Sequence, residues 1–264
     1  MNPAHGFDGR ELFCSQIKSV SRCYPPPPPT PNFIVNSFLY LDLAEFFLRR
    51  KFSPIKRDYI PSRQIPKTIH FAWFGGGRIP EHRQKNIDTW RRLLPDYEIV
   101  RWDENNFPIE SYPYAVDAYN KGIYAFVSDV ARLHAVYKYG GLYMDTNNEV
   151  IRPDAFDDLL SLDCFASYEA PCQISISTFG AKPNHPYIGT LLDFYKFIRL
   201  RSAYRLTANV RFISKLTRII YGSRLNGKRL TLSDGTVILP RDLFVPQTIT
   251  ENTRVIHHYR GSWK

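Results

Sequence analysis

The sequence is poor in cysteine and has no long apolar run, and each shortage excludes a class of protein. Its 264 residues include four cysteines (Cys14, Cys23, Cys164 and Cys172), and no two of them form a C-x-x-C pair. Neither a zinc ribbon nor a disulfide scaffold is therefore indicated. The apolar stretch 33–48 contains two acids and is shorter than the ~18 residues expected of a membrane-spanning helix. We expect a helix docked on the main domain there, with an in-plane membrane contact as the alternative.

Signals for secretion and for nucleic-acid recognition are also absent. The chain has no Asn-x-Ser/Thr acceptor, and its first residues lack the apolar core of a signal peptide, so we expect a cytoplasmic protein. No RNP, zinc-finger or helix-turn-helix pattern accompanies the net charge of +10 and the 15% aromatic content. A nucleic-acid binder is therefore the least favoured class of function.

The positive charge is concentrated near one end of the chain. Residues 196–264 hold 14 of the 35 Lys and Arg but three of the 25 Asp and Glu, which favours an anionic partner. In this region Arg211, Lys215 and Arg218 share one face of an expected helix. They are predicted either to form a solvated face over a packed stripe or to contact anionic lipid headgroups, so a peripheral membrane contact stays open.

Hydrophobic patterning divides the chain into an extension and a folded domain. Residues 1–60 are predicted to form an arm, which ends in the proline run 25–29, followed by the accessory helix 33–48. From residue 61 to 264 the pattern is that of an α/β domain. The expected strands are 68–73, 97–102, 142–145, 164–168 and 174–179, the expected helices are 81–94, 125–139, 187–200 and 206–221, and a hairpin is expected at 229–239.

The most informative polar residues follow strand 142–145. Alternate side chains of a strand point to one face, so Asp145 and Asn147 can address a single ligand at the strand's carboxyl end. Two neighbouring oxygen ligands suit Mg²⁺ or Mn²⁺ carrying a diphosphate. The alternative is that residues 145–149 form a polar turn without a ligand.

The helix before this strand carries a pair of opposite charges. Asp129 and Arg132 are three residues apart and face the same way, which by itself predicts a surface ion pair. The helix leads through Gly140 and Gly141 directly into the acidic strand, however. That short connection would bring the pair close to the cation site.

Five ordered motifs resemble the DXD sugar-binding region of glycosyltransferase family 32. They are residues 65–76 (IPKTIHFAWFGG), Trp90 with 94–98 (LPDYE), 125–132 (AFVSDVAR), 139–146 (YGGLYMDT) and the closing segment 257–263 (HHYRGSW). The resemblance implies an α/β fold of GT-A type, a Rossmann-like mixed sheet flanked by helices, with residues 61–264 as catalytic domain and a helical N-terminal extension. It further implies a retaining glycosyltransferase, a nucleotide-sugar donor (UDP-sugar favoured over GDP-sugar), Mn²⁺ or Mg²⁺, and a glycan or lipid-linked acceptor.

The resemblance also implies roles for individual residues. Phe71, Ala72 and Trp73 would hold the nucleotide base, although Trp73 reads equally as a core aromatic at a strand end. The implied catalytic residues are Asp129, Arg132 and Asp145. The other implied donor-binding residues are Ser128, Tyr143, Thr146, Ser262 and Trp263, and the implied metal ligands are Asp145, Asn147, His258 and Ser262. A terminal His or Trp often serves only packing, which is the alternative for the closing segment.

Asn147 departs from the family pattern, because it stands where the second DXD carboxylate is expected. An amide offers one neutral oxygen where a carboxylate offers charge, so cation affinity should fall. Asn148 or Glu149 could compensate for that loss. The leading prediction is an active transferase, and the alternative is a catalytically weak or inactive protein that binds a nucleotide sugar or glycan on the same fold.

Overall fold

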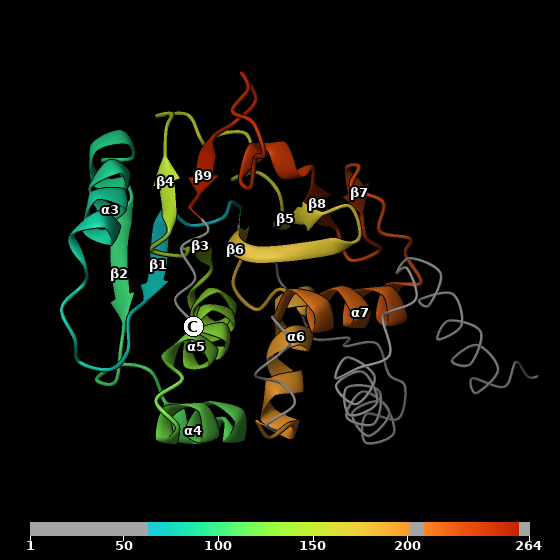
Figure 1. The fold of residues 1–264 in the computed structure, drawn as a ribbon. Helices are drawn as coiled ribbons and strands as arrows, with labels where there is room; N and C mark the ends of the chain where they lie inside the picture. The colour runs from blue at the N-terminus through green and yellow to red at the C-terminus, as the bar shows by residue number, and fades with distance from the viewer. Residues whose placement is uncertain (1–62, 201–208, 259–264) are drawn as a thin grey trace, which may run out of the picture.

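The computed structural model describes residues 63–200 and 209–258 (Figure 1). The predicted arm and accessory helix, together with Ser262 and Trp263, lie outside the described residues. The described elements form one seven-stranded sheet in the order β2-β1-β3-β6-β5-β8-β7 and a separate two-stranded ladder of β4 and β9.

One half of the sheet is parallel. β1 (Thr68–Ala72) pairs with both β2 (Glu98–Trp102) and β3 (Gly141–Met144). β1 is connected to β2 through α3 (Glu81–Leu93), and α5 (Tyr124–Tyr139) precedes β3. This is the predicted βαβ unit with a third parallel strand added, and it is Rossmann-like.

The other half of the sheet is mainly antiparallel. β6 (Gln173–Ala181) is antiparallel to both β3 and β5 (Cys164–Ala170), whereas β5 is parallel to β8 (Thr236–Leu239). A short strand, β7 (Leu230–Thr231), closes the edge in the predicted hairpin with β8. The predicted α/β fold with a mixed sheet is thus confirmed for the described residues.

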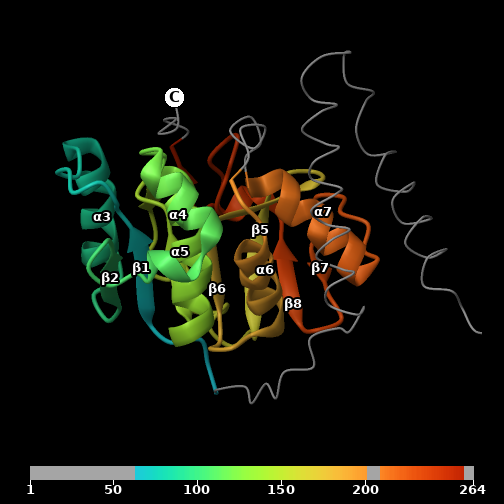
Figure 2. The ribbon, with the colours of Figure 1, turned by 90° about the horizontal axis from the view of Figure 1, so that it is seen from below.

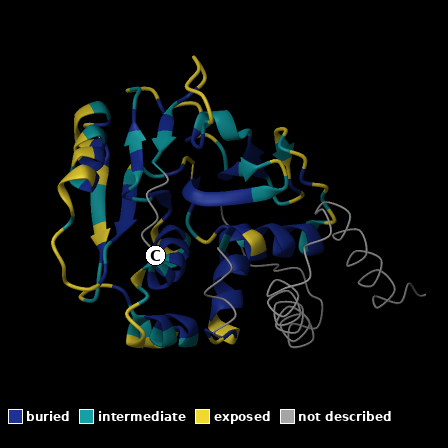
Figure 3. Ribbon diagram, viewed as in Figure 1, coloured by how far each residue is buried: buried dark blue, intermediate teal, exposed yellow. Residues whose placement is uncertain are grey.

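Helices cover the sheet on both faces and bury two apolar cores. α4 (Pro113–Asn120), α5, α6 (Pro186–Phe197) and α7 (Asn209–Tyr221) lie side by side in Figure 2 and share one core with the strands. α3 packs Ile87 and Trp90 into the second core, against Phe71, Leu142 and Met144. Figure 3 shows that α5 and β6 are mainly buried, whereas the outer side of α3 is exposed.

The turn between α5 and β3 requires its two glycines. Gly140 and Gly141 have φ of 69° and 94°, a region that side chains with a Cβ rarely adopt. A Cβ on Gly141 would lie 2.6 Å from the carbonyl oxygen of Thr68 on the neighbouring strand. His70 Nε2 donates to the Gly140 oxygen over 2.9 Å, and Trp102 Nε1 donates to His70 Nδ1 over 3.2 Å. Burial lowers the pKa of His70 to about 4, so the imidazole is neutral and holds the turn through both ring nitrogens.

The structure corrects some sequence expectations. The helix predicted at 187–200 ends at Phe197, because Ile198 adopts an extended conformation. Lys215 and Arg218, expected at the surface, are 5% and 6% exposed, and only Arg211 of that trio is exposed. The sequence analysis also missed α4, two short helical turns at Ile109–Ser111 and Arg241–Leu243 (η2 and η4), and the ladder of β4 (Asn148–Val150) with β9 (Val255–His257). Within 63–200 and 209–258, no helix has the length and apolar character needed to cross a bilayer.

Candidate functional site

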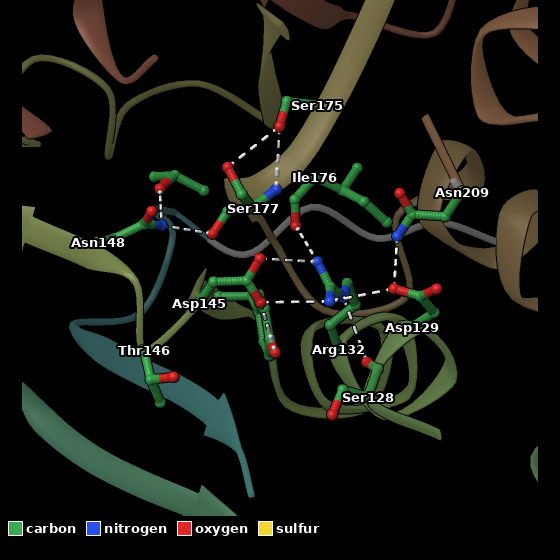
Figure 4. Close-up of polar contacts among 12 residues, drawn as sticks. Ser128, Asp129, Arg132, Asp145, Thr146, Asn148, Ser175, Ile176, Ser177 and Asn209 are labelled. Carbon is green, nitrogen blue, oxygen red and sulfur yellow. Dashed lines mark hydrogen bonds and ion pairs between the residues drawn. The ribbon is translucent and has the colours of Figure 1, made fainter. Parts of the chain in front are cut away.

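Arg132 stands at the centre of a buried charge cluster (Figure 4). Its Nη2 lies 3.1 Å from Asp129 Oδ1 and 3.2 Å from Asp145 Oδ1, and its Nη1 donates to the carbonyl oxygen of Ile176 over 2.9 Å. The Arg132 and Asp129 side chains are 7% and 9% exposed, so they do not form the surface ion pair that their spacing alone suggested. The short Gly-Gly connection does bring the pair to Asp145, as the sequence predicted.

One guanidinium therefore faces two carboxylates. The pKa of Asp129 is raised to about 7: burial and the charge of Asp145 raise it, and Arg132 and a hydrogen bond from Asn209 oppose the shift. Asn209 Nδ2 donates to Asp129 Oδ1 over 2.5 Å from the first turn of α7. When both carboxylates are ionised, they carry one negative charge more than Arg132 offsets, which favours binding of a cation or of a ligand rich in hydrogen-bond donors.

Tyr143 supports the cluster from below rather than lining an open pocket. Its ring is 1% exposed and lies under the guanidinium of Arg132, 4.8 Å from the ring centre. Its hydroxyl donates to Asp145 Oδ1 over 3.2 Å. Asp145 is thereby oriented by two neighbours, and its side chain is still 25% exposed.

The D-x-N segment forms a turn that hydrogen bonds hold against β6 and α3. The Asp145 amide donates to the Ser177 oxygen on β6, and the Asn148 amide donates back to the Asp145 oxygen, each over 2.8 Å. Thr146, predicted to bind the donor, is 5% exposed, and its hydroxyl accepts a hydrogen bond from Arg83 over 2.9 Å. The polar turn of the alternative interpretation is thus present, and it is held so that Asp145 and Asn147 stay partly exposed.

The end of the described chain returns to this turn. β9 pairs antiparallel with β4, which places His257 opposite Asn148. The amide of His258 donates to the Asn147 oxygen over 2.9 Å, and His258 Nε2 lies 2.8 Å from Glu149 Oε2. His258 therefore reaches the D-x-N turn as predicted, although its ring engages Glu149.

The charges of Asp145 and Arg132 act on His257, a residue that the sequence analysis did not place in the site. Burial lowers its pKa, and the charge of Asp145 opposes that shift while Arg132 and His258 add to it. Only His258 of this pair was predicted to act in the site. The alternation of β9 decides which of the two neighbours turns inward, and the sequence showed no strand there.

The residues predicted to hold the nucleotide base fall into two groups. Phe71 and Ala72 are 4% and 8% exposed and pack in the core on opposite sides of β1. Trp73 is half-buried at the end of that strand, where its Nε1 donates to the Gly77 oxygen over 2.8 Å and Arg83 stacks on its ring at 5.5 Å. Of the three, Trp73 is therefore best placed to meet a base.

Ser128 directly precedes Asp129 on α5, one helical turn before Arg132. It contacts the charge cluster through its backbone. Its hydroxyl donates to the Tyr124 oxygen over 3.0 Å, and its carbonyl oxygen accepts a hydrogen bond from Arg132 Nε over 3.2 Å. Asn209 was missed, as were Ser175 and Ser177 beside Asp145. No sequence signal could have found them, because they come from distant segments without a recognisable motif.

The candidate cation site has few ligands among the described residues. No group of three or more His, Cys, Asp or Glu side chains suited to a metal occurs in 63–200 and 209–258. Asp145 and Asn147 remain as oxygen ligands on one turn, with Glu149 two residues further on. Such a set fits a weakly held hard cation better than a closed structural site.

Comparison with known proteins finds a family that matches this region. Residues 80–166, which include Asp129, Arg132 and the D-x-N turn, match the family described as "glycosyltransferase sugar-binding region containing DXD motif". The resemblance to glycosyltransferase family 32 is therefore confirmed for this part of the chain.

Three relatives come from Schizosaccharomyces pombe (strain 972 / ATCC 24843). The chain is 30% identical to inositol phosphoceramide mannosyltransferase 3 over 170 residues, which cover 59% of this chain and 47% of the relative. It is also 30% identical to inositol phosphoceramide mannosyltransferases 2 and 1, with 49% and 47% of this chain matching 38% and 41% of theirs. The chain thus spans less than half the length of these relatives.

Two solved structures match the chain at low sequence identity. PaToxG glycosyltransferase superposes with a TM-score of 0.45 at 17% identity, covering 81% of this chain and 80% of that one. A glycosyltransferase involved in the glycosylation of the major capsid of PBCV-1 superposes with a TM-score of 0.42 at 11% identity, covering 75% and 95%.

Proposed function

We propose that this chain is a glycosyltransferase that moves a hexosyl group from a nucleotide-sugar donor to a glycan or lipid-linked acceptor with retention at the anomeric carbon. The observation that carries the proposal is the buried cluster of Asp129, Arg132 and Asp145 within the DXD-type region. Its residues offer both acceptors and donors of hydrogen bonds to sugar hydroxyls.

Each part of the site has a distinct task in this proposal. Asp129 and Arg132 bind hydroxyl groups of the donor sugar, and Trp73 stacks on the nucleotide base. Asp145 faces the ribose and the diphosphate, with Asn147 beside it. When bound there, Mn²⁺ or Mg²⁺ would supply positive charge that offsets the charge developing on the leaving diphosphate. His258, Ser262 and Trp263 are proposed to close over that end of the donor, with His258 and Ser262 as further metal ligands.

The proposed reaction is a front-face substitution. The bond from the anomeric carbon to the phosphate oxygen breaks, and the acceptor oxygen bonds to that carbon on the same face. The acceptor's proton passes to the leaving phosphate. The buried carboxylate of Asp129 would stabilise positive character on the sugar ring. A covalent adduct of the sugar with any side chain, trapped and identified by mass spectrometry, would exclude this route.

For the donor and the acceptor we propose chemical classes only. The names of the S. pombe relatives favour mannose as the sugar and a phosphoinositol sphingolipid as acceptor, whereas the family resemblance alone favoured a UDP-sugar. Contact with an anionic membrane would suit a lipid acceptor. It would have to use exposed cations such as Arg211, Arg224, Lys228 and Arg229, because Lys215 and Arg218 are buried. Failure of the protein to float with anionic liposomes would contradict such contact.

A donor panel tests the proposal directly. We expect one of GDP-mannose, UDP-glucose, UDP-galactose and UDP-N-acetylglucosamine to raise the thermal midpoint in the presence of Mn²⁺, and to be cleaved. Asn147→Asp adds a carboxylate beside Asp145 and should tighten cation binding roughly tenfold, since charged ligands bind hard cations more strongly. Titration of Mn²⁺ at fixed donor concentration measures this change.

The same panel separates the two functions that Asn147 leaves open. Binding of a donor without hydrolysis or transfer, in both the wild type and Asn147→Asp, would favour a sugar-binding protein on this fold. Absence of binding by both forms to every donor would overturn the enzyme proposal. Asp88→Asn on the exposed side of α3 is the matched control and should behave as the wild type.

A further inference from the structure

Glu169 occupies an irregular position near the end of β5. Tyr168 pairs with Ile174 and Ala170 pairs with Gln173, so two steps along β5 match one step along β6. Glu169 is the extra residue of this β-bulge. Bulges re-aim a side chain away from the regular alternation of the strand, and they are over-represented next to active sites.

A line of polar groups connects Glu169 with the D-x-N turn. Its carboxylate lies near enough to Ser175 for that side chain to act on its pKa, and the Ser175 hydroxyl lies 3.0 Å from that of Ser177. The carbonyl oxygen of Ser177 accepts from the Asp145 amide over 2.8 Å and from Asn148 Nδ2 over 2.7 Å. Figure 4 shows Ser177 near Asp145, with Ser175 further along β6. Glu169 therefore approaches the proposed donor site from the antiparallel half of the sheet.

The Glu169 carboxylate is enclosed but lacks a cation within ion-pairing distance among residues 63–200 and 209–258. Burial raises its pKa, the hydrogen bond from Ser175 lowers it, the charge of Asp145 raises it, and Arg241 acts on it from further away. The residue as a whole is half-buried. Next to it, Ser167 is paired with Ser175 across the strands, and its fully buried hydroxyl has no hydrogen-bond partner. Ser167 and Ser175 are buried, so Glu169 is the member of this polar strip that a ligand can reach.

The other two carboxylates of the site are already engaged. Asp129 is bound by Arg132 and Asn209, and Asp145 by Arg132 and Tyr143. Among the described residues, Glu169 has no ion pair, and the Ser175 side chain is its hydrogen-bonding neighbour. An ionised carboxylate can accept several hydrogen bonds, and sugar or cyclitol hydroxyls are donors that match it. A transferase that acts on a sugar or cyclitol must hold this second polyol next to the donor sugar.

We propose that Glu169 is an acceptor-binding residue, which accepts a hydrogen bond from a hydroxyl group neighbouring the one that attacks, on a sugar or cyclitol acceptor. The assignment rests on the proposed transferase function. Glu169 makes and breaks no covalent bond in this role. Ser175 and Ser177 are positioning residues that hold the carboxylate against the turn carrying Asp145.

Glu169→Gln tests this role with little risk to the fold, because the amide oxygen can still accept from Ser175. The measurement uses the donor that the panel identifies, with inositol phosphoceramide in detergent and methyl α-D-mannopyranoside as the two acceptor probes. Transfer and donor hydrolysis by water are followed in the same reaction. We expect donor affinity and hydrolysis within about twofold of wild type, and transfer reduced at least tenfold through a higher acceptor KM.

The matched control is Glu98→Gln, the same chemical change at an exposed position on β2, which should leave all readouts unchanged. Equal transfer by Glu169→Gln and the control would overturn the assignment. Weakened donor binding with unchanged acceptor KM would also overturn it, since Glu169 would then act on the donor. A wild-type protein that binds and cleaves none of the donors would instead overturn the proposed function, and the acceptor role would fall with it.

Discussion

The parallel and antiparallel halves of the sheet build the candidate site in different ways. In the parallel half, Asp129, Arg132, Tyr143 and Asp145 lie within 17 residues, on α5 and the strand that follows it. In the antiparallel half, Ser175 and Ser177 come from β6, Glu169 from β5 and Asn209 from α7. The residues of the first group are close in sequence, and the short connection between α5 and β3 brings them together. The residues of the second group meet only because segments far apart in the sequence become neighbours.

Arg132 is the residue on which both halves meet, since it binds Asp129 and Asp145 and also donates to the backbone of β6. We expect Arg132→Met to lower the free energy of unfolding by about 3–5 kcal/mol, because it leaves the buried carboxylate of Asp129 and the partly exposed one of Asp145 without their cation. Urea unfolding measures the change. Arg91→Met, which breaks an exposed pair with Asp88, should cost at most about 0.5 kcal/mol. Similar losses in the two variants would mean that the cluster does not join the halves.

Asp129 gives the local group a measurable dependence on pH. Its pKa in the folded state, about 7, lies above its ordinary value of 3.8, so its contribution to stability is full below pH ~3.8 and is lost as pH rises through about 7. Asp129→Asn removes this titration. We expect the variant to gain up to a few kcal/mol relative to wild type between pH 4.5 and 8. Urea unfolding at four pH values in this range tests the sign, and parallel curves for the two proteins would contradict the assignment.

Asn209 tests how strongly residues outside α5 and β3 affect the stability of the charge cluster and the pKa of Asp129. Asn209→Ala removes the hydrogen bond to Asp129 and should cost about 1–2 kcal/mol of stability, because the acceptor is charged and buried. The apparent pKa of Asp129 should rise as well, since the hydrogen bond stabilises the carboxylate. Asn226→Ala, at an exposed loop position, serves as the control. An unchanged pH profile in Asn209→Ala would show that α7 merely packs beside the site.

The extent of prediction from sequence follows the same division. The strands 68–73, 97–102 and 142–145 and the helices 81–94 and 125–139 were predicted to within one or two residues, whereas α4 was missed. The approach of Asp129 and Arg132 to Asp145 followed from a helix, two glycines and a strand. Burial of the pair was not foreseen, because spacing on a helix does not reveal what covers that face. His257 was overlooked in favour of its neighbour, because the β4–β9 ladder brings together segments about 100 residues apart.

The D-x-N motif, the charged pair before it and the glycines between them were determined by the sequence alone, since the contacts that join them are local. The tertiary structure decided that β6 lies beside β3, that the bulge carrying Glu169 lies at the sheet edge that also holds Asp145, and that β9 returns to the D-x-N turn. These pairings depend on burying two apolar cores around a mixed sheet. The free energy that stabilises these pairings comes from many apolar side chains spread along the sequence, so no short motif predicts them.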